Sequence, residues 1–211
     1  MEEREGMSQP SQNQIIDAIE QGMKKAQRDS IKYSNRFAFQ APEYLSSVYV
    51  YQRLGKLYSQ DWLSFETKSK DVDALRILRP PGRKPNAVKG NGRCDLVLWN
   101  TRTNRPRAVV EFKKRTANAS NDLKRLSFLV GEGGLDFAIS ASFGYERVAA
   151  RGTKQLPIRE QTNNVVSDLK KTRPRVSATP MLPPSISQRI DPEGNGKVQQ
   201  WMWCPVCILL K

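Results

Sequence analysis

The chain has 211 residues, of which 38% are hydrophobic and 27% charged, a composition typical of one globular domain with a sizeable core. Its 35 Lys and Arg exceed its 21 Asp and Glu, and the formal net charge of +14 favours a polyanionic partner, nucleic acid before an anionic membrane. The chain contains no His, which excludes Ser-His and Cys-His nucleophilic systems and leaves acid–base chemistry to carboxylates, Lys, Tyr or a metal site.

Membrane insertion and secretion are not expected. No stretch approaches the roughly 18 consecutive apolar residues that a membrane span needs, and the first residues are acidic and polar, unlike a signal peptide. We therefore predict a cytoplasmic protein without a membrane partner. A basic protein with no polyanionic partner would fit the charge as well.

Two helices are predicted in the N-terminal quarter. Apolar residues recur at helical spacing over residues 11–28, with Ser11 as a plausible N-cap. A second helix is expected over residues 42–57, with Pro42 in its first turn. We expect residues 1–40 to form an N-terminal tail and helix, and residues 41–211 to form a single domain.

A strand and a basic loop follow. Residues 62–67 alternate in polarity and predict a first strand, which residues 71–78 either extend or meet as a hairpin. Residues 79–93 are basic and rich in Pro and Gly, which predicts an exposed loop suited to phosphate contact. The residues expected to contact nucleic acid, here and further along the chain, are Arg83, Lys84, Lys89, Arg93, Lys114 and Lys124.

Two short apolar runs carry charges that buried strands rarely hold. Residues 93–99 contain Asp95, and residues 108–114 contain Glu111 and Lys113. Buried carboxylate and ammonium groups are costly unless they pair with each other or bind a metal. Because side chains alternate along a strand, Glu111 and Lys113 share one face, and Asp95 joins them if the two strands are neighbours.

The remaining elements complete a mixed α/β pattern. A helix is predicted over residues 120–129, followed by a buried strand over 135–143. Lys124 and Arg125 lie off the apolar stripe of this helix, where solvated charges are the preferred interpretation and phosphate contact is the alternative. A helix over 158–171, short strands near 175–178 and 186–190, and a final strand over 198–210 follow. A helix, strands, a helix and a strand indicate a mixed sheet with a helical crossover.

Residues 92–98 (GRCDLVL) and 109–113 (VVEFK), with a helix before and a helix after, resemble the PD-(D/E)xK nuclease superfamily. The resemblance implies a restriction-endonuclease-like αβββαβ core over about residues 41–143: a mixed central sheet flanked by helices. Residues 144–211 would be a C-terminal extension with an extra helix and strand. One departure is Cys94, which stands where the family usually has proline.

In that family the aspartate and glutamate bind Mg²⁺, with Mn²⁺ as a substitute, so the resemblance assigns these roles to Asp95 and Glu111. The backbone carbonyl between glutamate and lysine, here Phe112, is a further ligand, and the lysine, here Lys113, orients or activates the attacking water. An acidic residue of the preceding helix maps onto Glu43, with Glu66 as a weaker competitor. Hard oxygen ligands of this kind suit Mg²⁺ independently of the resemblance.

Other interpretations of the same residues stay open. Asp95, Glu111 and Lys113 could form only an ion-pair cluster at strand ends, and Glu43 could simply stabilise a helix N-terminus. Cys204 and Cys207 are half of a zinc site, but small buried residues in a terminal strand are the preferred interpretation.

The sequence predicts a Mg²⁺-dependent deoxyribonuclease, an endonuclease in preference to an exonuclease, with RNA as the less favoured substrate. The alternatives are an inactive nucleic-acid-binding module, or a nuclease subunit of a larger transposition or defence complex. Homodimers are common among related folds, but the sequence carries no interface signal.

Overall fold

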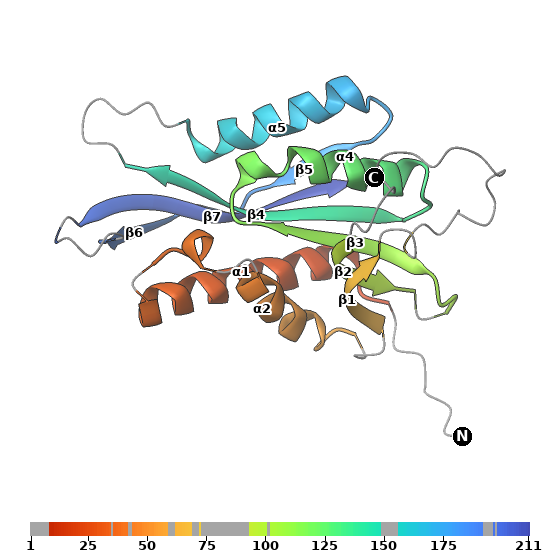
Figure 1. The fold of residues 1–211 in the computed structure, drawn as a ribbon, viewed down its shortest axis with the longest axis horizontal. Helices are drawn as coiled ribbons and strands as arrows, with labels where there is room; N and C mark the ends of the chain where they lie inside the picture. Colours follow the sequence, from red (N-terminus) through yellow and green to blue (C-terminus); the bar gives the residue numbers. More distant parts are fainter. Residues whose placement is uncertain are drawn as a thin grey trace.

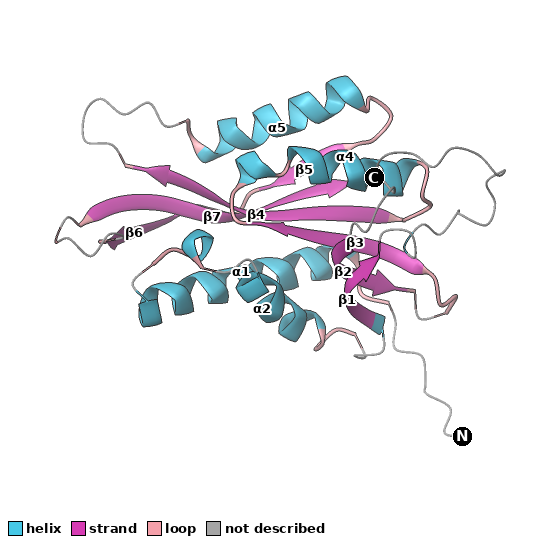
Figure 2. Cartoon of the chain, in the orientation of Figure 1, coloured by secondary structure: helices cyan, strands magenta, loops and turns pink. Residues whose placement is uncertain are grey.

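Seven strands form one mixed, open sheet with helices on both of its faces (Figures 1 and 2). The computed structural model describes residues 9–34, 36–41, 44–58, 62–68, 72, 93–100, 102–148, 156–191, 196 and 198–211. The strand order is β1-β2-β3-β4-β7-β5, and β6 also pairs with β7. This confirms the predicted α/β class with a mixed central sheet.

The elements lie close to their predicted positions. The helices are α1 (Gln12–Ser34), α2 (Tyr44–Leu54), α4 (Ser120–Gly131) and α5 (Ile158–Thr172), with short 3-10 turns η1 (Ala38–Gln40) and η5 (Thr116–Asn118). The strands are β1 (Leu63–Lys68), β2 (Arg93–Trp99), β3 (Pro106–Lys113), β4 (Phe137–Arg147), β5 (Ala178–Met181), β6 (Ile186–Ile190) and β7 (Gln199–Leu210).

Helix α1 begins as predicted and ends later. Ser11 and Gln14 exchange hydrogen bonds between side chain and backbone N–H, a reciprocal N-terminal cap. The helix continues past residue 28 because Ile31 still packs against the core. Helix α2 is shorter than predicted, since residues 55–58 turn with hydrogen bonds back to Tyr51, Arg53 and Leu54.

The sheet separates two apolar layers. Helices α1 and α2 cover one face, where Ile15, Ile19 and Met23 lie fully buried against side chains of β2, β3, β4 and β7. Helices α4 and α5 cover the other face, where Leu123 and Leu126 pack with Val97 and Val109. Helix α1 therefore belongs to the same core as the sheet.

Strand topology places the ends of β2 and β3 beside α4. Strands β1, β2 and β3 are antiparallel neighbours, and α4 provides the crossover that makes β4 parallel to β3. Strand β4 is longer than predicted, because β7 pairs with it as far as Arg147. At the other edge of β7, β6 pairs with residues 199–203 and β5 with residues 207–210.

No helix within the described ranges is long and apolar enough to cross a bilayer. The basic loop over residues 79–92 and most of residues 71–78 lie outside the described residues.

Candidate active site

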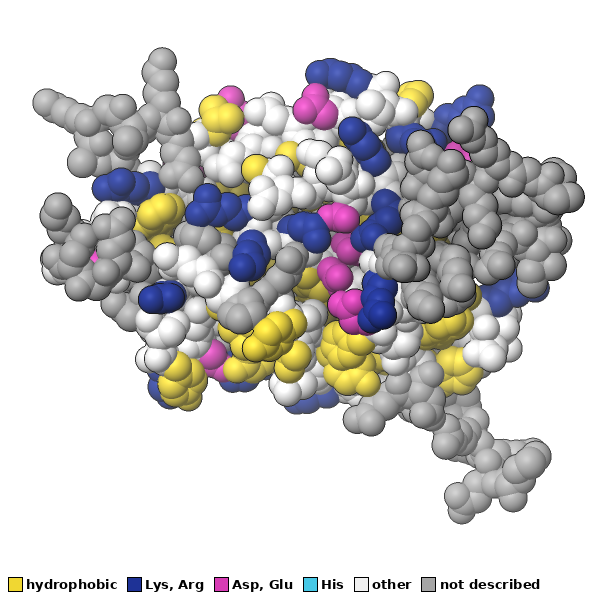
Figure 3. Space-filling view, in the orientation of Figure 1, with side chains coloured by type: hydrophobic (Ala, Val, Ile, Leu, Met, Phe, Trp, Pro, Cys, Tyr) yellow, Lys and Arg dark blue, Asp and Glu magenta, His cyan; other side chains and the backbone are white. Residues whose placement is uncertain are grey.

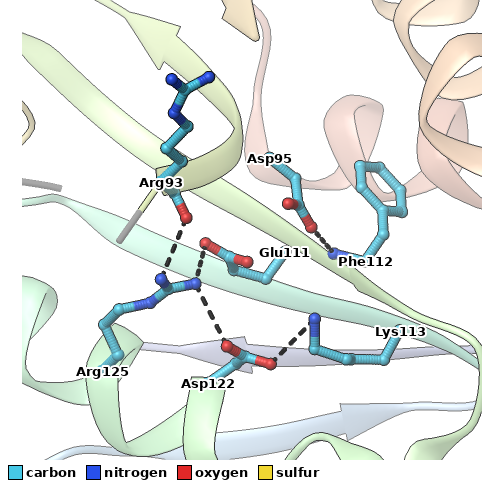
Figure 4. Close-up of polar contacts among 7 residues, drawn as sticks. All are labelled: Arg93, Asp95, Glu111, Phe112, Lys113, Asp122 and Arg125. Carbon is cyan, nitrogen blue, oxygen red and sulfur yellow. Dashed lines mark hydrogen bonds and ion pairs between the residues drawn. The ribbon is translucent and has the colours of Figure 1, made fainter. Parts of the chain in front are cut away.

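Strands β2 and β3 bring Asp95 and Glu111 to the same point of the sheet. Their register pairs Leu96 with Val110, so one step further along Asp95 stands opposite Glu111. The Asp95 carboxylate accepts a hydrogen bond from the backbone N–H of Phe112, with Oδ2 2.7 Å from the nitrogen (Figure 4). This bond to the neighbouring strand fixes the carboxylate beside Glu111.

Phe112 directs its backbone N–H toward the same point. In a strand, the N–H and C=O of one residue face the same neighbouring strand. The Phe112 N–H points to Asp95 on β2, so we expect its carbonyl to face β2 as well. Two carboxylates therefore lie where β2 and β3 meet, and strand geometry predicts the Phe112 carbonyl beside them.

Glu111 is held almost completely out of water. Its side chain is 1% exposed, and burial raises its pKa to about 9, with the nearby Asp95 carboxylate acting in the same direction. The Arg125 guanidinium opposes this increase, with Nη2 2.5 Å from Oε1 of Glu111. Among the described residues, no hydrogen-bond donor reaches this buried Oε1 in acceptable geometry. Oε1 of Glu111 therefore has the Arg125 guanidinium in contact but no well-aligned hydrogen bond.

Helix α4 supplies two charged residues to the site. Asp122 Oδ2 lies 3.1 Å from Lys113 Nζ, and Asp122 Oδ1 lies 3.2 Å from Arg125 Nη2. Arg125 Nη1 also donates to the backbone carbonyl of Arg93, at 3.0 Å. Glu111 and Lys113 therefore belong to one ion network with Asp122 and Arg125, whereas Asp95 contacts the backbone N–H of Phe112 (Figure 4).

Sequence reasoning missed the role of α4. Arg125 was expected to be a solvated helix charge, which is wrong: its side chain is 18% exposed and contacts Glu111. Asp122 was not considered. A signal existed, because Asp122 and Arg125 are spaced i,i+3 around the buried Leu123 on the helix that follows Lys113. Lys124 is exposed, as expected for a solvated charge.

The donor set fits a hard divalent cation. Mg²⁺ prefers oxygen ligands and usually keeps several waters, so two carboxylates and a carbonyl suffice when substrate phosphate adds to them. The buried Oε1 of Glu111 is consistent with such a ligand. Among the described residues, however, no group of three or more His, Cys, Asp and Glu is arranged to hold a metal. Glu43, the expected additional ligand, lies outside the described residues.

Glu66 on β1 lies at the same level of the sheet as Asp95 on β2. The register pairs Phe65 with Leu96 and Thr67 with Cys94, which leaves Glu66 at the level of Asp95. Its φ of 50° is the left-handed region that non-glycine residues rarely adopt. The side chain is exposed and lies 3.9 Å from the Arg93 guanidinium, so it is not part of the buried network.

The face drawn in Figure 3 carries side chains of both charges. Figure 3 shows a short row of acidic side chains crossing the middle of the visible face, with Lys and Arg side chains on both sides. Of the residues predicted to contact nucleic acid, Arg93 and Lys124 are exposed and Lys114 is half-buried. Arg83, Lys84 and Lys89 lie outside the described residues.

The cysteines of β7 are buried, as preferred from the sequence. Cys204 packs in the apolar layer under α4 and α5, and Cys207 in the layer under α1. They lie on opposite faces of the sheet and cannot bind one zinc ion together. Burial raises the pKa of both thiols, that of Cys204 to about 11.

Comparison of the chain with protein-family models, curated proteins and solved structures gave no match.

Proposed function

We propose that the protein is a metal-dependent nuclease with a restriction-endonuclease-like core that hydrolyses phosphodiester bonds in DNA, as an endonuclease. The observation that carries this proposal is the position of Asp95 opposite Glu111, with Lys113 on the same face of β3. The element order α2-β1-β2-β3-α4-β4 supports it, because it is the αβββαβ order of that fold.

Each side chain of the site would have its own role in phosphodiester hydrolysis. Bound Mg²⁺ would polarise the phosphodiester and stabilise its developing charge. Asp95, Glu111 and the Phe112 carbonyl would hold the ion, and the Lys113 ammonium would orient the attacking water and oppose negative charge on the phosphate. Asp122 positions that ammonium, since its carboxylate lies 3.1 Å from Nζ.

A second candidate is a non-catalytic nucleic-acid-binding module, alone or as a subunit of a larger nuclease complex. The ion network favours it, because the cations of Arg125 and Lys113 already pair with the carboxylates of Glu111 and Asp122. A network balanced in this way is also compatible with a site that has kept its fold and lost its reaction.

Cleavage of plasmid and linear DNA in Mg²⁺, Mn²⁺ and EDTA tests the proposal. Asp95→Ala and Lys113→Ala should each lower the rate of metal-dependent cutting by about 10²–10³-fold, as loss of a transition-state contact does. The matched controls are Asp168→Ala and Lys171→Ala, which break an exposed ion pair of 3.0 Å on α5.

Cutting that survives both site substitutions would show that these residues are not the active site. Absence of cutting by the wild type with either metal, while DNA binding persists, would favour the binding module.

A further inference from the structure

A small cavity lined by aromatic side chains opens at the end of the sheet reached by the chain after Lys113. It has a volume of about 120 Å³ and is lined by Arg115, Ala117, Phe143, Tyr145, Gln161 and Trp201. We call it the aromatic cavity. It is well below the roughly 300–1,000 Å³ of sites for drug-sized ligands, and it suits a single planar ring system.

Two aromatic side chains that line the cavity, Tyr145 and Trp201, pack against a further aromatic residue. Phe37 packs edge-on against both Tyr145 and Trp201, with ring centroids 5.2 and 5.3 Å away. The Tyr145 hydroxyl donates to the buried Oε1 of Gln27 at 2.7 Å. A cavity with fixed walls loses little side-chain entropy when a ligand enters.

The polar groups of the aromatic cavity can read the edge of a flat heterocycle. The buried Nε1 of Trp201 finds no acceptor among the described residues. Gln161 uses its Nε2 to donate to the backbone carbonyls of Tyr145 and Leu156, which leaves its Oε1 as an acceptor. Trp201, Gln161 and Arg115 all line the cavity, and they carry a donor, an acceptor and a cation, the groups that would recognise a nucleobase edge and the phosphate attached to it.

The aromatic cavity is adjacent to the candidate active site along the chain. Lys113 pairs with Ser142 of β4, and Phe143, the next residue, lines the cavity. Arg115 follows Lys113 by two residues, roughly 7 Å of extended chain. Thr116 joins the two regions, since its hydroxyl lies 3.0 Å from that of Ser142.

We propose that the aromatic cavity binds one unstacked base of the nucleic-acid strand whose phosphodiester is held at Lys113. The substrate is then a single strand or a locally opened duplex, because a paired base cannot leave its stack without cost. This inference rests on the proposed function, since it places the base relative to that site.

Binding of single-stranded oligonucleotides in EDTA tests it without any cutting. A series of oligonucleotides of about twelve nucleotides, each with one abasic position, is titrated by fluorescence anisotropy, in DNA and in RNA form. One position, or two adjacent ones, should lose about tenfold in affinity, the cost of one base–aromatic stack. The nucleic acid, DNA or RNA, in which one abasic position lowers the affinity is the ligand of the aromatic cavity.

The blocking variant is Ala117→Trp, which places a large side chain in the aromatic cavity from an exposed position. The matched control is Asn118→Trp, on the same turn and equally exposed but outside the cavity lining. Thermal unfolding verifies that both variants fold. Ala117→Trp should bind all oligonucleotides with the affinity of the weakest abasic one, and Asn118→Trp should behave as the wild type.

Three results would overturn the inference. They are equal affinity for every oligonucleotide of the abasic series, wild-type affinity in the Ala117→Trp variant, and equal affinity for single strands and a fully paired duplex. Failure of the nuclease proposal is distinguishable. If one abasic position weakens binding but the protein does not cut DNA in Mg²⁺, base binding in the aromatic cavity is supported and the nuclease proposal is wrong. If the protein cuts DNA but every abasic position has the same affinity, the nuclease proposal stands and base binding in the cavity is wrong.

Discussion

Glu111 is nearly inaccessible to water and lies between a carboxylate on β2 and a guanidinium on α4. A buried carboxyl group releases its proton reluctantly, and the second carboxylate strengthens this effect. One guanidinium does not offset both influences, which is why the pKa of Glu111 rises to about 9. Glu111 therefore stays protonated to a pH well above its usual range, and ionising it in the folded protein carries a free-energy cost.

That cost predicts a pH dependence of stability. In EDTA, the free energy of unfolding contributed by Glu111 should be fully present below about pH 4.5 and be lost as the pH rises towards about 9. The slope is at most about 1.4 kcal/mol per pH unit. Urea unfolding across this range should show a steeper decline for the wild type than for Glu111→Gln, and parallel curves would contradict the raised pKa.

Arg125 should contribute to stability because it partners a buried carboxyl group. Arg125→Met should lower the free energy of unfolding at pH 7 by roughly 1–3 kcal/mol, the cost of a buried polar group left without its partner. Lys124→Met, its exposed neighbour, should stay within about 0.5 kcal/mol of the wild type. Equal stability of the two variants in urea unfolding would argue against the ion pair.

Among the secondary-structure elements, helices α1 and α2 approach each other closely at Gly22. A Cβ added to Gly22 would lie 2.6 Å from the Cα of Val50, a backbone atom that cannot move aside alone. This close approach lets both helices pack on the same face of the sheet, where Val50 is fully buried. The crossing therefore depends on the absence of one methyl group.

A pair of glycine substitutions tests the crossing. Gly22→Ala should lower the free energy of unfolding by about 1–3 kcal/mol, as overpacking does. Gly131→Ala, in the last turn of α4, meets only an ordinary 3.5 Å contact with Val176 and should be neutral or stabilising by up to about 1 kcal/mol. Calorimetry that finds both variants equally stable would contradict the close approach.

At the scale of the whole molecule, the formal net charge is +14, whereas the candidate site holds the three carboxyl groups of Asp95, Glu111 and Asp122. Lys and Arg side chains on both sides of a row of carboxylates can bind the phosphates of a nucleic-acid strand that crosses the row. The carboxylates themselves can bind a cation. Binding should then be dominated by phosphate contacts, which release counterions from the nucleic acid.

Affinity for DNA should accordingly fall by about tenfold or more between 50 and 200 mM salt, as it does when several phosphates are contacted. Anisotropy titrations in EDTA measure this directly. Lys170→Gln, which removes an exposed charge near the end of α5, should leave the slope nearly unchanged. A flat response to salt in the wild type would argue against phosphate-dominated binding.

The sequence by itself determined the α/β class, the strands that carry Asp95, Glu111 and Lys113, and the face that the last two share. These follow from local rules: apolar runs of strand length, and the alternation of side chains along a strand. The sequence also indicated that Cys204 and Cys207 are buried.

Only the tertiary structure decided which charges surround the site. Asp122 and Arg125 have the local pattern of an amphipathic helix surface, and their contacts with Lys113 and Glu111 exist because the crossover lays α4 over β3. The aromatic cavity likewise joins side chains from η5, β4, α5 and β7, which are distant in sequence. Such contacts depend on how elements pack in space, and no local periodicity encodes them.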